Sequence, residues 1–416
     1  MTPEQKQQFA ETLHTLSVRG LSIALGIVGS VITARYLGAE DRGNFFYWSY
    51  IAALIVQFGN FGLHASNIYL LANSNSIPGT LLSNSTLVAL VVCALGPPIV
   101  ALPLVMTTSA TLGPWSYIAL SGLVFSGLYL LLGSNLLLGL SQVVAFNKIE
   151  IWNKSLIFIF LASATITFGS WEISLLAVSG AGILTCLMLR SSLRTFVTPA
   201  RSDLSVLRLA APYGARAYIV AALSFLALKL NVFLLGSSAS SLDFGVWSIT
   251  AQITEYIVVL PSTVALILLP RIMNAGDKGA LLWPTFWVTL LAVGAVSIFV
   301  LGFGKPLILF LYGDEFIGAY RYLVLSLPCI TMIALMTVLS QYLAAIGIPV
   351  WNILIWAGVI LLNFIFFNFA HKQFGIEGAI GVQSISFFLG FIAMLALVLR
   401  SFQQVEIKTG NEKIIC

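Results

Sequence analysis

The sequence has very little charge. Only 8% of its 416 residues are Asp, Glu, Lys or Arg, against roughly 25% in an average soluble domain. Hydrophobic residues make up 59% of the chain, and the mean hydropathy is +1.00. A soluble chain with so few charged side chains would be unable to cover its own surface. We therefore expect lipid to be the main solvent around this protein.

Cysteine and histidine are also scarce, with 4 and 3 residues. Cys93, Cys186 and Cys329 lie inside apolar runs, and Cys416 is the final residue. No CxxC motif or paired Cys/His spacing occurs, so we expect neither a disulfide framework nor a metal site. The buried thiols are interpreted as small hydrophobic side chains.

Sequence signals of catalysis are missing as well. We find no nucleophile–base pair, no glycine-rich phosphate loop and no ATP-binding sequence. The protein is therefore predicted to be a transporter and not an enzyme, with no cofactor and no direct drive by ATP. The net charge of +5 comes from residues at helix ends and in loops. Because no basic stripe forms, we expect no nucleic-acid partner.

Long apolar runs fill the chain from end to end. A helix needs about 20 apolar residues to cross a bilayer, and the length of the chain allows about 12 such spans joined by short loops. We expect an all-α polytopic membrane protein with almost no mass outside the membrane. The predicted spans are 12–37, 44–72, 81–106, 115–140, 151–168, 173–189, 212–235, 244–269, 281–301, 319–346, 350–370 and 376–399.

The basic residues predict the orientation and the division of the chain. Most of the 20 lysines and arginines fall on the side of the N-terminus, which places both termini in the cytoplasm. The most basic loop carries Arg190, Arg194, Arg201 and Arg208 and is predicted to be a central linker. The predicted parts are an N-lobe at 1–190, a linker at 191–211, a C-lobe at 212–400 and a cytoplasmic tail at 401–416.

The two predicted lobes share a weak internal repeat. Arg19 precedes Leu37-Gly38 by nearly the distance at which Arg216 precedes Leu235-Gly236. Six spans in each half would make the halves parallel repeats, an architecture of transporters with a substrate site between the halves. We expect two pseudo-symmetric six-helix lobes around a central cavity, although small residues shared by chance would also explain the match.

Glycines mark the ends of several predicted helices. Leu37-Gly38 before a charged cluster is typical of a helix C-terminus closed by glycine. Gly313 before Asp314 is typical of a turn, and Gly375 is predicted to end a polar connection. The segment 305–312 is too short to span a membrane and is predicted to be interfacial.

Three stretches that contain these glycines carry a family resemblance. They are ARYLGAEDRG at 34–43, LYGDEF at 311–316 and FGIEGA at 374–379. In this order and spacing, the chain resembles the polysaccharide and O-antigen flippases of the multidrug/oligosaccharidyl-lipid/polysaccharide (MOP) exporter superfamily.

The resemblance implies a multi-pass protein of the bacterial inner membrane. Such a protein moves an undecaprenyl-pyrophosphate-linked oligosaccharide, the repeat unit of O-antigen or another surface polysaccharide, from the cytoplasmic to the periplasmic leaflet. It works by alternating access among membrane lipids. The resemblance also implies the polysaccharide polymerase and the chain-length machinery as partners.

A pyrophosphate headgroup needs fixed cations along its path, and the spans contain few. Arg19, Arg216, Lys229 and Arg35 are the candidate substrate-binding cations. Arg19 and Arg216 are equally explained by snorkelling to the inner headgroups, and Arg35 by anchoring at the interface. Lys229 is surrounded by leucines well inside its span, where a lysine is costly unless it is paired or hydrated.

The remaining candidates are acidic or neutral. Glu255 is a carboxylate well inside a span, and it is interpreted either as the ion-coupling residue or as an ion-pair partner of Lys229. His64 and Asn60, with Gln57 and Asn67, are spaced as one helical polar stripe. The stripe would bind sugar hydroxyls in the cavity, or it would make the interhelical hydrogen bonds that are common in membrane bundles.

Other functions remain open from the sequence. A cation-coupled multidrug antiporter of the same superfamily would favour carboxylates in the N-lobe, and residues 19–39 contain none. A peptidoglycan-precursor flippase would usually be longer by two spans. A membrane-embedded polymerase or glycosyltransferase would need a large outer loop or a pair of acids, and the connection at 302–318 is small.

Overall fold

The computed structural model describes the backbone of residues 3–73, 78–107, 113–274, 279–345 and 350–412. Within its helices, the described side chains leave out 3–16, 72–73, 102–107, 207, 209–217, 260–274, 279–280 and 403–412. Over these described ranges the secondary structure is helical, without a β-strand. This result confirms the all-α fold class.

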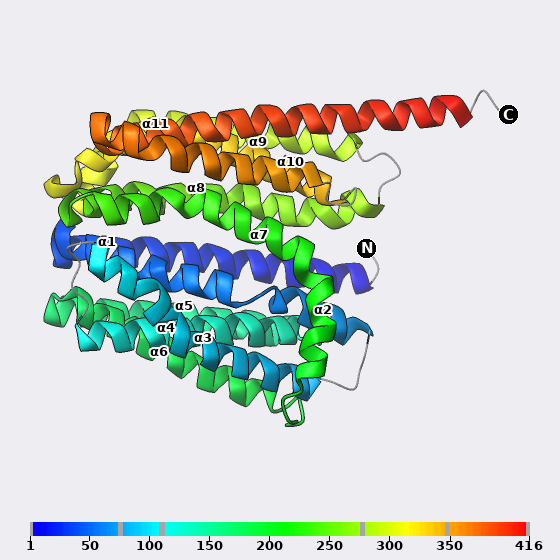
Figure 1. The fold of residues 1–416 in the computed structure, drawn as a ribbon, viewed down its shortest axis with the longest axis horizontal. Helices are drawn as coiled ribbons and strands as arrows, with labels where there is room; N and C mark the ends of the chain where they lie inside the picture. Colours follow the sequence, from blue (N-terminus) through cyan, green and yellow to red (C-terminus); the bar gives the residue numbers. More distant parts are fainter. Residues whose placement is uncertain (1–2, 74–77, 108–112, 275–278, 346–349, 413–416) are drawn as a thin grey trace. The chain divides into compact units, whose positions relative to one another are not determined.

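Long helices joined by short connections make up the described chain (Figure 1). Their apolar composition requires the backbone polar groups to be satisfied within each segment, which the α-helix achieves in lipid. The helices are α1 (Pro3–Gly59), α2 (Leu63–Asn73), α3 (Pro78–Thr107), α4 (Pro114–Gly139), α5 (Val143–Phe168), α6 (Trp171–Leu193), α7 (Leu204–Ser238), α8 (Ser241–Asn274), α9 (Gly279–Tyr312), the 3-10 turn η1 (Asp314–Phe316), α10 (Gly318–Ala345) and α11 (Val350–Glu412).

Nine of the described helices are long and apolar enough to span a membrane. Two of them, Ser17–Gly59 with 43 residues and Val350–Phe402 with 53 residues, are long enough to cross twice. Each contains a glycine with a non-helical backbone at the expected crossing point, Gly38 or Gly375. With these two divisions the nine candidates become eleven, and α8 (Ser241–Asn274) lies where the remaining span, 244–269, is predicted.

The glycine predictions hold at three positions. Gly38 has a φ of 72°, Gly313 a φ of 98° and Gly375 a φ of 59°, all in the left-handed region that glycine adopts at low cost. Residues 305–312, predicted to be interfacial, are not a separate element, and their place in the membrane stays a prediction. They form the last two turns of α9, which continues through Pro306.

The chain forms two compact units. The first comprises Met1–Ala222 and Ser240–Gly245, and the second comprises Leu223–Ala239 and Val246–Cys416. The boundary therefore falls inside α7. The residues predicted as a linker, 191–211, lie within the first unit.

In the first unit, a buried arginine closes the end of the first membrane span. Arg42 follows the Gly38 kink and is only 2% exposed. Its guanidinium donates to the Ser30 carbonyl at 2.8 Å, to the Ser30 hydroxyl at 3.0 Å and to the Thr33 hydroxyl. A buried guanidinium is costly unless its N–H groups are hydrogen-bonded, and these acceptors on the preceding helix satisfy it. Arg42 therefore has a structural role that its loop position did not suggest.

Small residues hold α4 and α6 together in the same unit. A Cβ atom on Gly122 would lie 2.1 Å from the Ser179 hydroxyl, and one on Gly182 would lie 2.5 Å from the Ser126 hydroxyl. The two glycine–serine pairs are reciprocal, with one member of each pair on each helix. Close approach at small residues is the usual basis of helix packing in lipid, where apolar burial supplies little drive.

Candidate transport site

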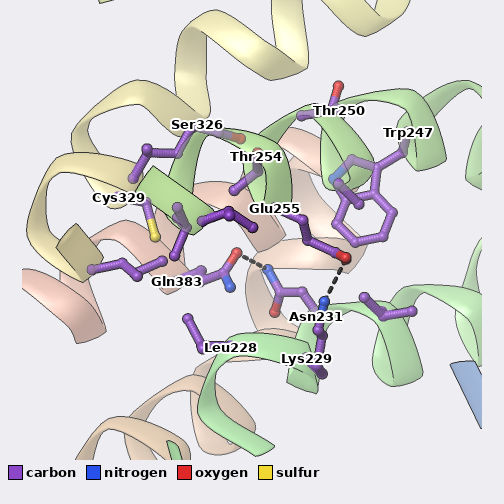
Figure 2. A pocket seen from close by; sticks show the side chains of 16 residues that line it. Leu228, Lys229, Asn231, Trp247, Thr250, Thr254, Glu255, Ser326, Cys329 and Gln383 are labelled. Carbon is purple, nitrogen blue, oxygen red and sulfur yellow. Dashed lines mark hydrogen bonds and ion pairs between the residues drawn. The ribbon is translucent and has the colours of Figure 1, made fainter. Parts of the chain in front are cut away.

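A cavity of about 260 Å³ lies inside the second unit. It is bounded by α7, α8, α10 and α11, and Figure 2 shows the side chains that surround it. Leu228 and Val232 of α7 and Ile330 and Ile333 of α10 make much of its wall apolar. The polar groups in the cavity are few, and they converge from different helices.

The main polar feature of the cavity is an ion pair between α7 and α8. The Lys229 ammonium contacts the Glu255 Oε1 atom (Figure 2). The side chains are 15% and 37% exposed, and both line the cavity. Each charge alone inside an apolar span would be costly, and each compensates the other. The pairing considered from the sequence is therefore present.

An amide cluster lies beside this ion pair. Asn231 of α7, 1% exposed, donates through Nδ2 to the Ala379 carbonyl at 3.1 Å and to the Gln383 Oε1 atom at 2.9 Å, both on α11. Among the described residues, its Oδ1 atom has no hydrogen-bond partner. Sequence reasoning missed both amides, although Asn231 is only two residues from Lys229 in an apolar run.

Hydroxyl groups complete the polar lining. Thr250 and Thr254 of α8 and Ser326 of α10 face the cavity with Trp247 (Figure 2). Thr250 donates to the Ala319 carbonyl at 2.9 Å and so ties α8 to the start of α10. Gln252, also on α8, donates to the Tyr256 hydroxyl at 3.0 Å. The cavity thus offers one cation, one carboxylate and neutral hydrogen-bonding groups.

Arg19 and Arg35, two of the other predicted cations, do not line this cavity. Arg19, half-buried, and Arg35, exposed one turn before Gly38, both lie on α1 in the first unit. Arg216 lies in α7, and its side chain is outside the described residues. Of the seven predicted site residues, Lys229 and Glu255 are brought together here, and substrate binding by the three arginines stays a prediction.

The predicted polar stripe on a continuous helix was wrong, because the helix breaks within it. α1 ends at Gly59 and α2 begins at Leu63, while Phe61 and Gly62 have φ values of 47° and 77°. The Phe58 carbonyl before the break accepts a hydrogen bond from the Tyr218 hydroxyl at 2.7 Å. Non-helical backbone at membrane depth is tolerated only where such partners satisfy it.

Asn60 organises this break. It is fully buried, and its Oδ1 atom accepts from the Gly62 backbone N–H at 2.8 Å and lies 2.9 Å from His64 Nδ1. Its Nδ2 atom donates to the Gln57 carbonyl at 2.6 Å. Asn67 instead bonds the Ser85 hydroxyl of α3 at 3.1 Å. The structure thus gives Asn60 and His64 local partners, and their predicted contact with sugars is untested.

Replacing Asn60 should therefore destabilise the protein. Asn60→Ala leaves the buried Gly62 N–H without its partner, which costs about 1–3 kcal/mol, and should speed hydrogen exchange at 59–64. Thermal unfolding in detergent and exchange mass spectrometry measure both effects. Asn135→Ala is the matched control, because among the described residues Asn135 bonds only the Leu131 carbonyl of its own helix. Equal stability of the two variants would contradict the assigned role of Asn60.

Solved transporter structures are similar to this chain over nearly its whole length. The lipid II flippase MurJ, in an inward closed conformation, matches with a TM-score of 0.75 and 12% identity, covering 92% of this chain and 87% of its own. An inward-facing multidrug resistance MATE family transporter of the MOP superfamily matches with a TM-score of 0.72 and 14% identity, covering 93% and 98%. A MOP superfamily transporter from Pyrococcus furiosus matches with a TM-score of 0.65 and 16% identity, covering 95% and 94%.

No protein-family profile matches the chain, and no curated protein matches it in sequence. The structural likenesses, at such low identity, establish the fold. The protein is a multi-pass membrane protein with the fold of MOP superfamily transporters.

Proposed function

We propose that this protein is a flippase that carries a pyrophosphate-linked, lipid-anchored oligosaccharide across the bacterial inner membrane by alternating access. The observation that carries the proposal is the Lys229–Glu255 ion pair in the cavity of the second unit. An anionic headgroup can replace Glu255 as the partner of Lys229 without leaving the ammonium uncompensated. The released carboxylate then favours its neutral, protonated form, since an unpaired charge in an apolar cavity is costly.

The size of the cavity supports a charged headgroup as the ligand. Sites for drug-sized molecules usually enclose about 300–1,000 Å³, whereas this cavity measures about 260 Å³. A diphosphate or a single sugar is the appropriate scale. The amides of Asn231 and Gln383 and the hydroxyls of Thr254 and Ser326 supply neutral hydrogen-bonding groups around it.

The replacement of Glu255 by the headgroup as the partner of Lys229 would also couple transport to proton movement. Glu255 would be protonated when the headgroup binds Lys229 and ionised again when the headgroup leaves and the Lys229–Glu255 pair re-forms. One proton would then cross the membrane in each transport cycle. The two states differ in their affinity for substrate and proton, and this difference is what allows a ligand to shift a conformational equilibrium. The expected chemistry requires no ATP and no cofactor.

Proteoliposomes test the proposal directly. The purified protein would be reconstituted with a fluorescent polyprenyl-pyrophosphate-linked oligosaccharide, and access of a membrane-impermeant quencher would follow its movement between leaflets. We expect faster movement than in protein-free vesicles and a dependence on the pH gradient. No transbilayer movement by folded protein would refute the flippase function.

A cation-coupled multidrug antiporter is the second candidate, and Glu255 is the observation that favours it. A cationic drug would compete with Lys229 for this carboxylate, and neighbours of the same fold are multidrug transporters by name. The two functions predict opposite results for Lys229→Ala. This change removes the partner of an anionic headgroup, whereas it frees Glu255 for a cationic drug. A third candidate is transport of a peptidoglycan precursor. Repeating the assay with fluorescent lipid II as the substrate distinguishes it from transport of the oligosaccharide.

A further inference from the structure

A second cavity lies within the first unit, where α6 ends and α3 begins. It encloses about 460 Å³ and shares no lining residue with the cavity of Lys229 and Glu255. Its walls come from the first four turns of α3, from α4, from the end of α6 and from the connection to α7. The polar lining consists of Ser83, Thr86, Tyr129, Arg190, Arg194 and Ser202.

Two guanidinium groups dominate the polar end of this cavity. Arg190 and Arg194 lie about one helical turn apart on α6 and its C-terminal cap, and both are exposed. Within the described residues, neither forms an ion pair with a carboxylate. Two guanidinium groups at this spacing suit a phosphate, because each planar fork can bond two oxygens.

The nearest carboxylate in the sequence is engaged elsewhere. Asp203 caps the first turn of α7, where its Oδ1 atom accepts from the Ser205 hydroxyl at 2.7 Å and from the Ser205 N–H at 2.8 Å. These hydrogen bonds lower the pKa of the Asp203 carboxyl. Its negative charge is therefore directed toward the helix terminus, and Asp203 does not line the cavity.

The wall of the cavity is held in place without a ligand. The Ser83 hydroxyl donates to the Ala200 carbonyl at 2.6 Å, and the Asn84 amide exchanges two hydrogen bonds of 2.9 Å with the backbone of Asp203. A Cβ atom on Gly79 would lie only 2.2 Å from the Thr198 carbonyl, so the connection packs directly against the first turn of α3. The site is thus pre-formed, and binding need not order it.

The opposite side of the cavity is apolar and continues along α3. Leu87 and Leu90 line it and are 39% and 50% exposed. Both lie within the apolar Pro78–Ala101 span. The first turn of α3, which contains Gly79, presents the positive end of the helix dipole to the same space. The cavity therefore joins a cationic end, at the end of α6, to an apolar surface within the candidate span of α3.

We propose that this cavity binds the phosphate headgroup of a membrane lipid between Arg190 and Arg194, with the hydrocarbon chain along Leu87 and Leu90. The ligand class is a phosphate ester on a long apolar chain, which an anionic phospholipid or a polyprenyl phosphate supplies. The site stands independently of the proposed function. The distribution of lysine and arginine predicts that it faces the cytoplasmic leaflet.

Native mass spectrometry of the full chain in a neutral detergent tests the site. The probes are phosphatidylglycerol, polyprenyl phosphate, phosphatidylcholine and inorganic phosphate. We expect at least one of the two anionic lipids to bind about tenfold more tightly than phosphatidylcholine. R190A/R194A should abolish this preference, and R190K/R194K, which keeps the charge without the fork, should retain part of it. The anionic lipid that binds more tightly identifies the natural source of the phosphate.

Two further variants separate a built site from general surface charge. T86W fills the cavity and leaves both arginines in place, so it should also abolish the preference. K148A/K154A removes two exposed lysines of α5, in the same unit and on the same predicted side, and should have no effect. Equal loss in K148A/K154A, unchanged binding in T86W or displacement of the lipid by inorganic phosphate alone would overturn the proposal. Thermal unfolding without added lipid checks that each variant is folded.

Discussion

Lys229→Ala should lower translocation of the lipid-linked oligosaccharide by about 10- to 100-fold, the effect of losing a hydrogen bond to a charged group worth about 1.5–3 kcal/mol. The side chain is the cation of the second unit's cavity, where it pairs with Glu255. The variant should still fold, because the unpaired carboxyl can become neutral by taking up a proton. The quencher assay in proteoliposomes measures the rate, and the yield of monodisperse protein measures folding.

Three companion variants sharpen this test. Lys229→Arg keeps the charge and should retain more activity than Lys229→Ala. Glu255→Gln leaves the cation in place and removes the titrating group, so movement should persist but lose its dependence on the pH gradient. Lys372→Ala removes an exposed lysine of the same unit and is the matched control. Full activity of Lys229→Ala would exclude this ion pair from the transport site.

Gly245→Ala should lower the free energy of unfolding by more than about 3 kcal/mol, at the upper end of what single substitutions do. Residues 240–245 belong to the first unit, and a Cβ atom on Gly245 would lie 1.7 Å from the Ala39 carbonyl oxygen. The contact is reciprocal, since a Cβ atom on Gly43 would lie 2.2 Å from the Ser241 carbonyl. Because the obstructing atoms belong to the backbone, no side chain can rotate to make room.

Thermal unfolding in detergent measures this effect as a fall of several degrees in the midpoint. Gly294→Ala in α9 is the matched control, because nothing lies within 4 Å of the Cβ position there. That substitution should leave the stability unchanged or raise it, since alanine is the better helix former by about 1 kcal/mol. Equal unfolding midpoints for Gly245→Ala and Gly294→Ala would contradict the close approach of Gly245 to the Ala39 carbonyl.

Most of the helical layout was predictable because its causes are local. An apolar run long enough to cross the bilayer must satisfy its own backbone, and the helix is the local way to do so. The ends at Gly38, Gly313 and Gly375 were predictable for a similar reason, because a left-handed backbone selects glycine. The resemblance to MOP flippases pointed to the same superfamily whose fold the chain shares.

The prediction of a continuous helix failed where side chains satisfy the backbone groups that a helix would have paired. The break at 60–62 lies inside an apolar run and needs Asn60 and Tyr218 to satisfy it. The spacing of Gln57, Asn60 and His64 favoured a continuous helix. The periodicity of a sequence does not show where a side chain takes the place of a backbone hydrogen-bond partner. In α9 the opposite occurred, because the helix continues beyond the predicted end of its span at residue 301, through Pro306, to Tyr312.

The sequence by itself determined that this is an all-α membrane protein with about twelve spans, because hydrophobic length and scarce charge act locally along the chain. It also identified Lys229 and Glu255 as costly charges that require an explanation. Only the tertiary structure decided that they face one cavity. The two residues are 26 positions apart on different predicted spans, and the contact between them forms only where α7 and α8 meet. The same packing adds Asn231 and Gln383, whose hydrogen bond joins helices far apart in the chain.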